Sequence, residues 1–208
     1  DDLEENLDEL DEDSSSEEFS DPENRSPLIQ AAFDGDVRGV EQLIAARADL
    51  EERGDRGQTA LMYAAMEGHT RCVELLIAAR ANINARDNTG VTALISAAVA
   101  GRTDSVQVLV TANADIEARS NNGSTALIMA AAKGRSECVR LLVDLNADVH
   151  ATDNERYTAL LSAAQGSAFN AAPVANDNAM DDVDRVAPLP VAENGHRDCL
   201  QVLIEANA

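Results

Sequence analysis

The stretch Thr59-Ala60-Leu61-Met62-Tyr63-Ala64-Ala65 decides the fold of this chain, because its pattern returns three more times. Threonine, alanine, leucine, two variable residues and two alanines start again at Thr92, Thr125 and Thr158, a fixed period of 33 residues. A glycine and then an apolar stretch, such as Val73-Glu74-Leu75-Leu76-Ile77, follow the motif. A unit this small cannot bury its apolar face alone, so the period predicts a stack of similar helix pairs.

Each unit closes with a segment such as Ala81-Asn82-Ile83-Asn84-Ala85. Together with the period, these motifs resemble the ankyrin repeat, whose pattern is Thr-Pro-Leu-His-x-Ala-Ala, a Gly-His turn, a Val-x-x-Leu-Leu helix and a Gly-Ala-Asp-Val-Asn hairpin. The resemblance covers residues 26–208 and includes a degenerate first unit that opens at Ser26-Pro27-Leu28. It implies an all-α ankyrin-repeat solenoid of about five helix-turn-helix units with short hairpin loops. We expect the units at about residues 25–56, 57–89, 90–122, 123–155 and 156–208.

The family glycine that follows the second helix is replaced in every unit. Its positions hold Arg47, Arg80, Asn113, Asn146 and Asn207. This position usually needs a left-handed backbone, which asparagine tolerates better than arginine. We therefore expect the second helices of the first two units either to be slightly strained at their ends or to end differently.

The fifth unit is interrupted between its two helices. It begins regularly at Thr158, but the glycine expected at position 167 lies at Gly195, where Gly195-His196-Arg197-Asp198-Cys199-Leu200 restores the pattern. We expect an insertion over about residues 165–193. A loop longer than about 15 residues is usually functional or disordered. The dominance of Ala, Asn, Asp and Pro favours a disordered segment over an ordered docking element.

Composition and charge exclude several functional classes. The 208 residues are 45% hydrophobic but only 2% aromatic, which suits thin helix layers built from Ala, Leu, Ile and Val. No apolar run approaches the roughly 18 residues that span a bilayer, so we expect a soluble protein without membrane insertion. Residues 1–24 hold 13 of the 38 acidic residues and no basic residue, which predicts a disordered acidic tail. A net charge of −22 argues against nucleic-acid binding.

The sequence offers no catalytic or metal-binding motif. One repeat position, four residues after the glycine between the helices, holds Cys72, Ser105, Cys138 and Cys199. Small side chains at that position are expected to be buried packing residues in a reducing compartment. His69 and His196 occupy the Gly-His turn of the family pattern. We therefore predict no enzymatic activity, no catalytic residue, no cofactor and no metal site.

Ankyrin-like arrays bind partners through the hairpin tips and the exposed face of the first helix. Transferring that layout gives ten candidate partner-binding residues: Arg53, Arg56, Met66, Arg86, Asn88, Val91, Arg119, Asn121, Lys133 and Tyr157. Arg53, Arg86 and Arg119 share one repeat position, so stacking predicts a column of guanidinium groups that could read an acidic peptide. The alternative is a solvated edge, or pairing with the nearby carboxylates of Asp55, Asp87 and Glu117.

These features predict a protein-protein interaction module, an adaptor or scaffold, that binds a partner protein with an acidic segment through the concave surface of the array. We expect a monomer in the cytoplasm or nucleus. Two alternatives are a regulatory or targeting segment of a longer enzyme or channel polypeptide, and a structural spacer without a ligand. Ser14, Ser15 and Ser20 each stand three residues before a glutamate, which resembles the acceptor pattern of acid-directed serine kinases and predicts phosphorylation.

Overall fold

The computed structural model describes residues 25–169 and 194–206. These residues form ten helices: α1 (Pro27–Asp34), α2 (Val37–Ala45), α3 (Ala60–Glu67), α4 (Thr70–Ala78), α5 (Ala93–Ala100), α6 (Thr103–Thr111), α7 (Ala126–Ala132), α8 (Ser136–Asp144), α9 (Ala159–Phe169) and α10 (Asn194–Ala206). The predicted acidic tail with its three serines, most of the predicted insertion, and Asn207 lie outside the described residues.

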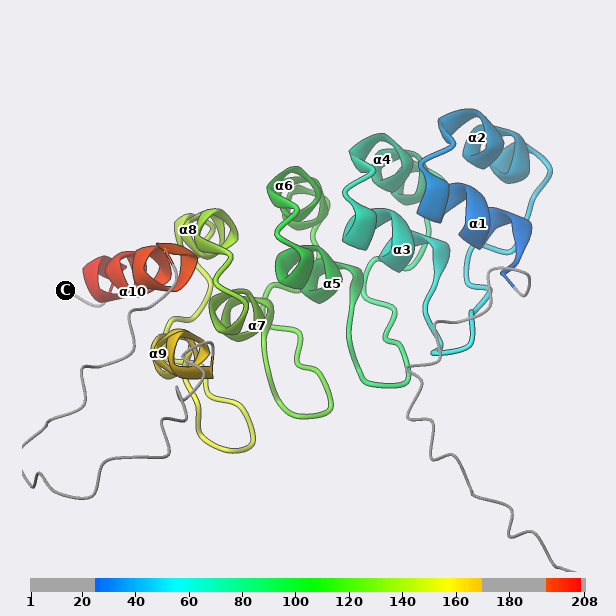
Figure 1. The fold of residues 1–208 in the computed structure, drawn as a ribbon. Helices are drawn as coiled ribbons and strands as arrows, with labels where there is room; N and C mark the ends of the chain where they lie inside the picture. Colours follow the sequence, from blue (N-terminus) through cyan, green and yellow to red (C-terminus); the bar gives the residue numbers. More distant parts are fainter. Residues whose placement is uncertain (1–24, 170–193, 207–208) are drawn as a thin grey trace, which may run out of the picture.

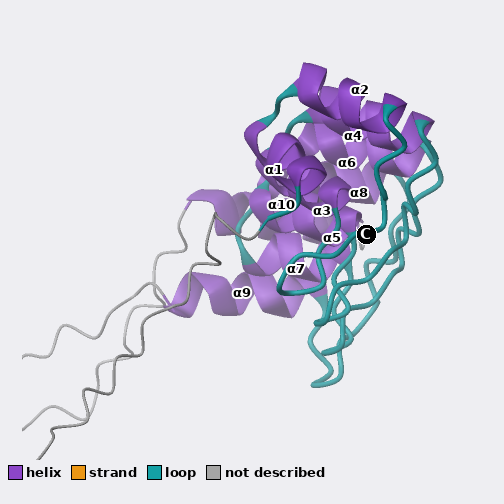
Figure 2. Cartoon of the chain, turned by 90° about the vertical axis from the view of Figure 1, so that its right-hand side faces the viewer, coloured by secondary structure: helices purple, strands orange, loops and turns teal. Residues whose placement is uncertain are grey.

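Each unit contributes an inner helix, an outer helix and a hairpin loop to a continuous array (Figure 1). The inner helices α1, α3, α5, α7 and α9 contact one another in order, and the outer helices α2, α4, α6, α8 and α10 do the same. The hairpins project side by side from one edge of the helix layers, as the teal loops of Figure 2 show. This arrangement confirms the predicted all-α repeat solenoid.

Caps encoded in the repeat set the ends of the inner helices. The Thr92 Oγ1 accepts a hydrogen bond of 3.4 Å from the Ile95 backbone N–H and so caps α5. At its other end α3 stops at Gly68, whose φ of 83° is left-handed. A Cβ at Gly68 would also lie 2.8 Å from Cδ of Arg102 in the next unit. The left-handed backbone therefore favours glycine there, and the Arg102 side chain would have to shift to admit a Cβ.

The outer helices of the first two units end in the same way as those that follow. Arg47 and Arg80 adopt left-handed φ values of 61° and 70°, close to 65° for Asn113 and 64° for Asn146. After α4, the N–H of Ala81 donates to the Leu76 carbonyl at 3.0 Å, which closes the turn. The expectation of slight strain therefore holds for the two arginines, and a different ending is wrong.

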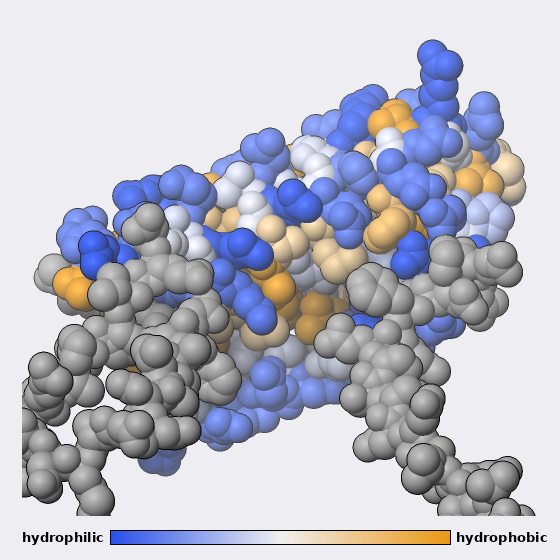
Figure 3. Space-filling view, viewed as in Figure 1, coloured by the Kyte–Doolittle hydropathy of each residue, from blue (hydrophilic) through white to orange (hydrophobic). Residues whose placement is uncertain are grey.

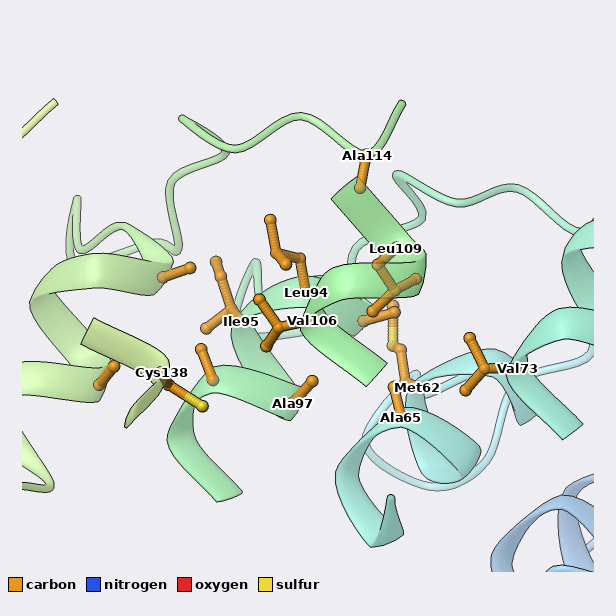
Figure 4. Close-up of a cluster of buried hydrophobic side chains, with 14 of the residues drawn as sticks. Met62, Ala65, Val73, Leu94, Ile95, Ala97, Val106, Leu109, Ala114 and Cys138 are labelled. Atoms are coloured by element: carbon orange, nitrogen blue, oxygen red, sulfur yellow. The ribbon is translucent and has the colours of Figure 1, made fainter. Parts of the chain in front are cut away.

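The core is continuous through all five units and is made of small and aliphatic side chains. Figure 4 shows Met62 and Ile95 of the inner helices among outer-helix side chains such as Val106 and Leu109. Cysteines at the shared repeat position lie in this core: Cys72, Cys138 and Cys199 are free thiols and at most 1% exposed. Their predicted role as buried packing residues is confirmed. Burial raises the pKa of the Cys138 and Cys199 thiols to about 11.

The second helix of the fifth unit returns to its place after the interruption. Helix α10 packs against both α8 and α9, and Cys199 and Leu203 are fully buried. Helix α9, however, continues to Phe169, past position 165 where we expected the insertion to begin. No left-handed glycine ends α9 as Gly68 ends α3, so the helix runs on through helix-favouring residues such as Ala164 and Gln165.

Candidate partner-binding surface

Two of the three repeated arginines of the hairpins, Arg53 and Arg119, bind backbone carbonyls. Nη1 of Arg53 donates to the carbonyl of Gly57 in its own hairpin at 3.0 Å and to that of Arg86 in the next hairpin at 2.7 Å. Arg119 repeats the arrangement with Gly123 at 3.2 Å and Thr152 at 2.6 Å. The two arginines therefore act as clamps between adjacent hairpins, which neither of our two sequence-based interpretations included.

Two of the carboxylates that we considered as partners of these arginines, Asp87 and Glu117, accept hydrogen bonds from the backbone. Oδ1 of Asp87 accepts from the N–H groups of Thr89 and Val91, both at 2.8 Å, and holds its own hairpin turn. Oε1 of Glu117 accepts from the Asp148 N–H of the following unit at 2.8 Å. Glu51 and Asn84, at the same repeat position as Glu117, accept from the next unit as well. Asp87 therefore stabilises its own hairpin, whereas Glu51, Asn84 and Glu117 connect neighbouring hairpins.

A ladder of asparagines connects the hairpin tips. Nδ2 of Asn121 donates to the Asn88 carbonyl at 3.0 Å, and Nδ2 of Asn154 donates to the Asn121 carbonyl at 3.1 Å. The oxygen of each asparagine lies against the glycine of the preceding hairpin, so that a Cβ at Gly90 would meet Oδ1 of Asn121. Nη2 of Arg86 also reaches Oδ1 of Asn121, at 3.4 Å. Three of the ten candidates, Asn88, Asn121 and Arg86, thus contribute to this ladder.

A second set of connections joins the turns between the helices. Nε2 of His69 donates to the Phe33 carbonyl of the preceding unit at 3.0 Å, and Nε2 of His196 reaches the Ala132 carbonyl at 3.2 Å. Nε of Arg102 makes the equivalent bond to Met66 at 3.1 Å, and Arg135 does the same one unit later. Sequence reasoning recognised the two turn histidines but missed these arginines. Their common position directly after the turn glycine was the available signal.

The inner helices keep a line of apolar side chains that are only partly covered. The residue two positions before each turn glycine is half-buried: Phe33, Met66, Val99 and Ala132, which we call the apolar band. Figure 3 shows an apolar strip along the middle of the array, between polar hairpins and a polar upper edge. Met66 was among the ten candidates, whereas Phe33 was missed because the first unit is degenerate.

A comparison with protein families agrees with this architecture. The family model described as ankyrin repeats (3 copies) matches residues 28–120 and 114–174. The chain belongs to the ankyrin-repeat family. Ankyrin repeats are generally protein-protein interaction modules and are typically not catalytic. No curated protein matches the chain significantly.

Of the remaining candidates, Arg56, Val91 and Tyr157 lie in the hairpins, and Lys133 directly follows α7. Arg56 and Lys133 are exposed, and Val91 and Tyr157 are half-buried. The residue that precedes each turn glycine changes along the array from Asp34 and Glu67 through Ala100 to Lys133. The charge beside the apolar band therefore changes from acidic in the first two units to basic in the fourth.

Other kinds of site find no support in the described part of the ankyrin array. Among residues 25–169 and 194–206, no group of three or more His, Cys, Asp or Glu side chains could hold a metal ion. No helix in the same ranges is long and apolar enough to cross a membrane.

Proposed function

We propose that this chain is an adaptor whose ankyrin array binds a partner protein through its concave surface, formed by the hairpins and the exposed ends of the inner helices. The observation that carries the proposal is the apolar band of Phe33, Met66, Val99 and Ala132. Covering apolar surface is favourable by about 25 cal/mol per Å². A contiguous line of such side chains on a polar surface is typical of an interaction site.

The charges beside the apolar band support one orientation of the partner's bound segment along the array. Asp34 and Glu67 would attract basic residues of the partner, and Lys133 would attract acidic ones. We therefore assign the acidic contact of the partner to Lys133. Arg53 and Arg119 are less suited to it, because each already donates to two carbonyls. Exposed charges of this kind contribute orientation and association rate more than affinity.

The proposal gives the chain no catalytic step of its own. It also assigns the protein to a reducing compartment, the cytoplasm or the nucleus. The three free and buried thiols support this assignment, because disulfides are rare in such compartments.

The test is affinity capture from cell extract with the full chain and with a Met66→Glu/Val99→Glu variant. Both side chains are half-buried on the inner helices, so the substitutions place charge in the apolar band. Gln107→Glu, on the exposed side of α6, is the matched control. We expect a partner that the wild type and the control retain and the double variant loses, with unchanged far-UV circular dichroism. Equal capture by all three would contradict the proposal.

A further inference from the structure

The second, third and fourth units present side chains of different size on the same face of their inner helices. Helix α5 of the third unit lies between α3 and α7 and contacts both (Figure 1). Residues three and four positions apart are neighbours on a helix. Three such positions hold, unit by unit, Tyr63, Met66 and Glu67, then Ser96, Val99 and Ala100, then Met129, Ala132 and Lys133. All are half-buried except Tyr63, which is 6% exposed, and Lys133, which is exposed. The third unit therefore has the shortest side chains, and Val99 lies between the longer Met66 and Met129.

The first unit does not continue this open surface. The guanidinium group of Arg25 lies over the Phe33 ring, 4.1 Å from the ring centroid, and 5.2 Å from the centroid of Tyr63. The two rings also contact each other edge to face, with centroids 6.0 Å apart. Phe33 is thus covered by a residue of the same chain. The open part of the apolar band consists of Met66, Val99 and Ala132.

A carboxylate lies on one side of the third unit. Glu67 is the last residue of α3, at the end where the helix dipole favours cations. It lines a depression of about 230 Å³ with Arg102 and Asp104, so two carboxylates and one guanidinium group leave one net negative charge there. Among the described residues, the Glu67 carboxylate has no hydrogen-bond or ion-pair partner. This carboxylate therefore does not stabilise its own helix and is available to a basic side chain of the partner.

A cation lies on the other side of the third unit. Lys133 directly follows α7 and is exposed. The two preceding units hold Glu67 and Ala100 at the same repeat position, so the charge goes from negative through neutral to positive. Neighbouring helices pack about 10 Å apart, which places each charge about 10 Å from the third unit. Two opposite charges therefore flank one apolar step of the array.

We propose that the third unit receives a bulky apolar side chain of the partner, an aromatic ring or a leucine, which lies over Val99 between Met66 and Met129. This inference rests on the proposed function. The shorter side chains of α5 leave room for the bulky group, and covering apolar surface supplies affinity. Methionines adapt to the shape of a ligand and make favourable sulfur contacts with aromatic rings. The same partner segment places a basic residue at Glu67 and an acidic residue at Lys133.

The spacing of the units sets the spacing of these three side chains in the partner. A segment that crosses the units in extended conformation covers about 10 Å in three residues, since each residue adds about 3.3 Å. The recognised segment therefore has the order basic residue, two residues, bulky apolar residue, two residues, acidic residue, read in either chain direction. This pattern is specific enough to be recognised in selected peptides.

Selection from a phage-displayed library of random peptides on the immobilised full chain tests the inference. Peptides of about 12 residues are suitable, because they are too short to form a stable helix alone. We expect enriched peptides with a bulky apolar residue between a basic and an acidic residue. Selection on a Glu67→Lys/Lys133→Glu variant should reverse the two charges and retain the apolar residue. Glu41→Lys/Arg140→Glu makes the same exchange at exposed positions of the outer helices and should enrich the wild-type order.

A synthetic peptide of the enriched sequence then gives the magnitudes by fluorescence anisotropy. Val99→Glu should weaken its binding at least about tenfold, because a carboxylate would lie under the apolar side chain. Lys133→Glu should weaken binding about three- to tenfold, because it replaces an attraction between exposed charges by a repulsion. Exchanging the acidic residue of the peptide for lysine should restore the affinity for this variant. Lys133 is exposed, so its substitution tests the charge without disturbing the fold.

The outcomes separate this inference from the proposed function. Peptides that the Met66→Glu/Val99→Glu variant no longer binds, but that lack the bulky residue or the charge order, overturn the inference and leave the proposed function intact. A charge order that Glu67→Lys/Lys133→Glu does not reverse also overturns the inference. Peptides that the double variant of the apolar band binds as well as the wild type, or a selection without an enriched sequence, overturn both.

Discussion

Position 123 and position 156 are the same place in successive repeats, and substitutions there should have opposite effects on stability. Gly123 has a φ of 81° and lies against Asn154 of the following hairpin, whereas Arg156, with a φ of 70°, has no following hairpin in the described structure. We predict that Gly123→Ala destabilises the array and that Arg156→Gly stabilises it slightly. The pair therefore tests whether hairpin stacking, rather than local backbone conformation alone, requires glycine.

The magnitude for Gly123→Ala follows from three contributions. A left-handed alanine costs about 1–2 kcal/mol. Its Cβ would lie 2.8 Å from the backbone nitrogen of Asn154. That clash displaces a hairpin held by bonds of 3.0 Å to Asn122 and 3.1 Å to Asn121, each worth about 1 kcal/mol net. Alanine also lowers the conformational entropy of the unfolded chain, which offsets about 0.5–1 kcal/mol of this loss. The predicted loss is about 2–4 kcal/mol.

Arg156→Gly removes the left-handed cost without any clash, but it increases the freedom of the unfolded chain. The net gain should be about 0.5–1 kcal/mol. Urea unfolding followed by far-UV circular dichroism measures the free energy of unfolding of both variants. Because repeat arrays unfold as coupled units, the dependence of this free energy on urea concentration is compared with that of the wild type. If Gly123→Ala lost less than about 1 kcal/mol, or if Arg156→Gly destabilised the array by that amount, the stacking argument would be refuted.

Three further predictions concern the core, the thiols and the turn arginines. Leu142→Ala empties a fully buried position and should lower the free energy of unfolding in urea by about 2–5 kcal/mol; a change below about 1 kcal/mol would disprove the tight packing of α8. The thiols of Cys138 and Cys199 have their pKa raised from 9.0 to about 11 by burial, so the folded state holds these protons more tightly than the unfolded chain. Their contribution to stability is complete below about pH 9 and is lost between about pH 9 and 11. The free energy of unfolding should therefore fall less steeply over this pH range in the Cys138→Ala/Cys199→Ala variant than in the wild type. Identical pH profiles of the two proteins would count against the raised pKa. Arg102→Ala breaks a hydrogen bond to the preceding unit and should lower the free energy of unfolding, measured by thermal unfolding, by about 1 kcal/mol. The control Arg71→Ala removes only an exposed ion pair and should lower it by less than about 0.5 kcal/mol. Equal losses in the two variants would speak against the inter-unit role of Arg102.

The sequence was sufficient for the fold because the repeat encodes it locally. The motif that begins at Thr92 contains both the cap of α5 and its buried face. The buried position of Cys72, Cys138 and Cys199 followed from their common place in the period. The end of α9 was predicted less accurately. The expected turn glycine is displaced to Gly195, and no other residue marks where the helix stops.

The roles of the surface side chains were harder to predict, because their hydrogen-bond acceptors are backbone carbonyls. The pattern of Arg53, Arg86 and Arg119 predicted a column of guanidinium groups, but nothing in it reveals the carbonyls of Gly57 and Thr152 that bind two of the three. A carbonyl is present at every residue and leaves no trace in composition or spacing. Only the fold brings one hairpin's carbonyl next to another hairpin's guanidinium group.

This difference gives a rule for separating the two roles of surface residues in the array. Bonds between neighbouring units recur at equivalent positions of the period, as the clamps of Arg53 and Arg119 and the turn bonds of Arg102 and Arg135 do. A partner protein has no such period and gains nothing from repetition. A side chain that breaks the period, such as Lys133 in the charge series, has no recurring bond to make. We therefore expect partner recognition at the side chains that break the period. The recurring arginines instead stabilise the array.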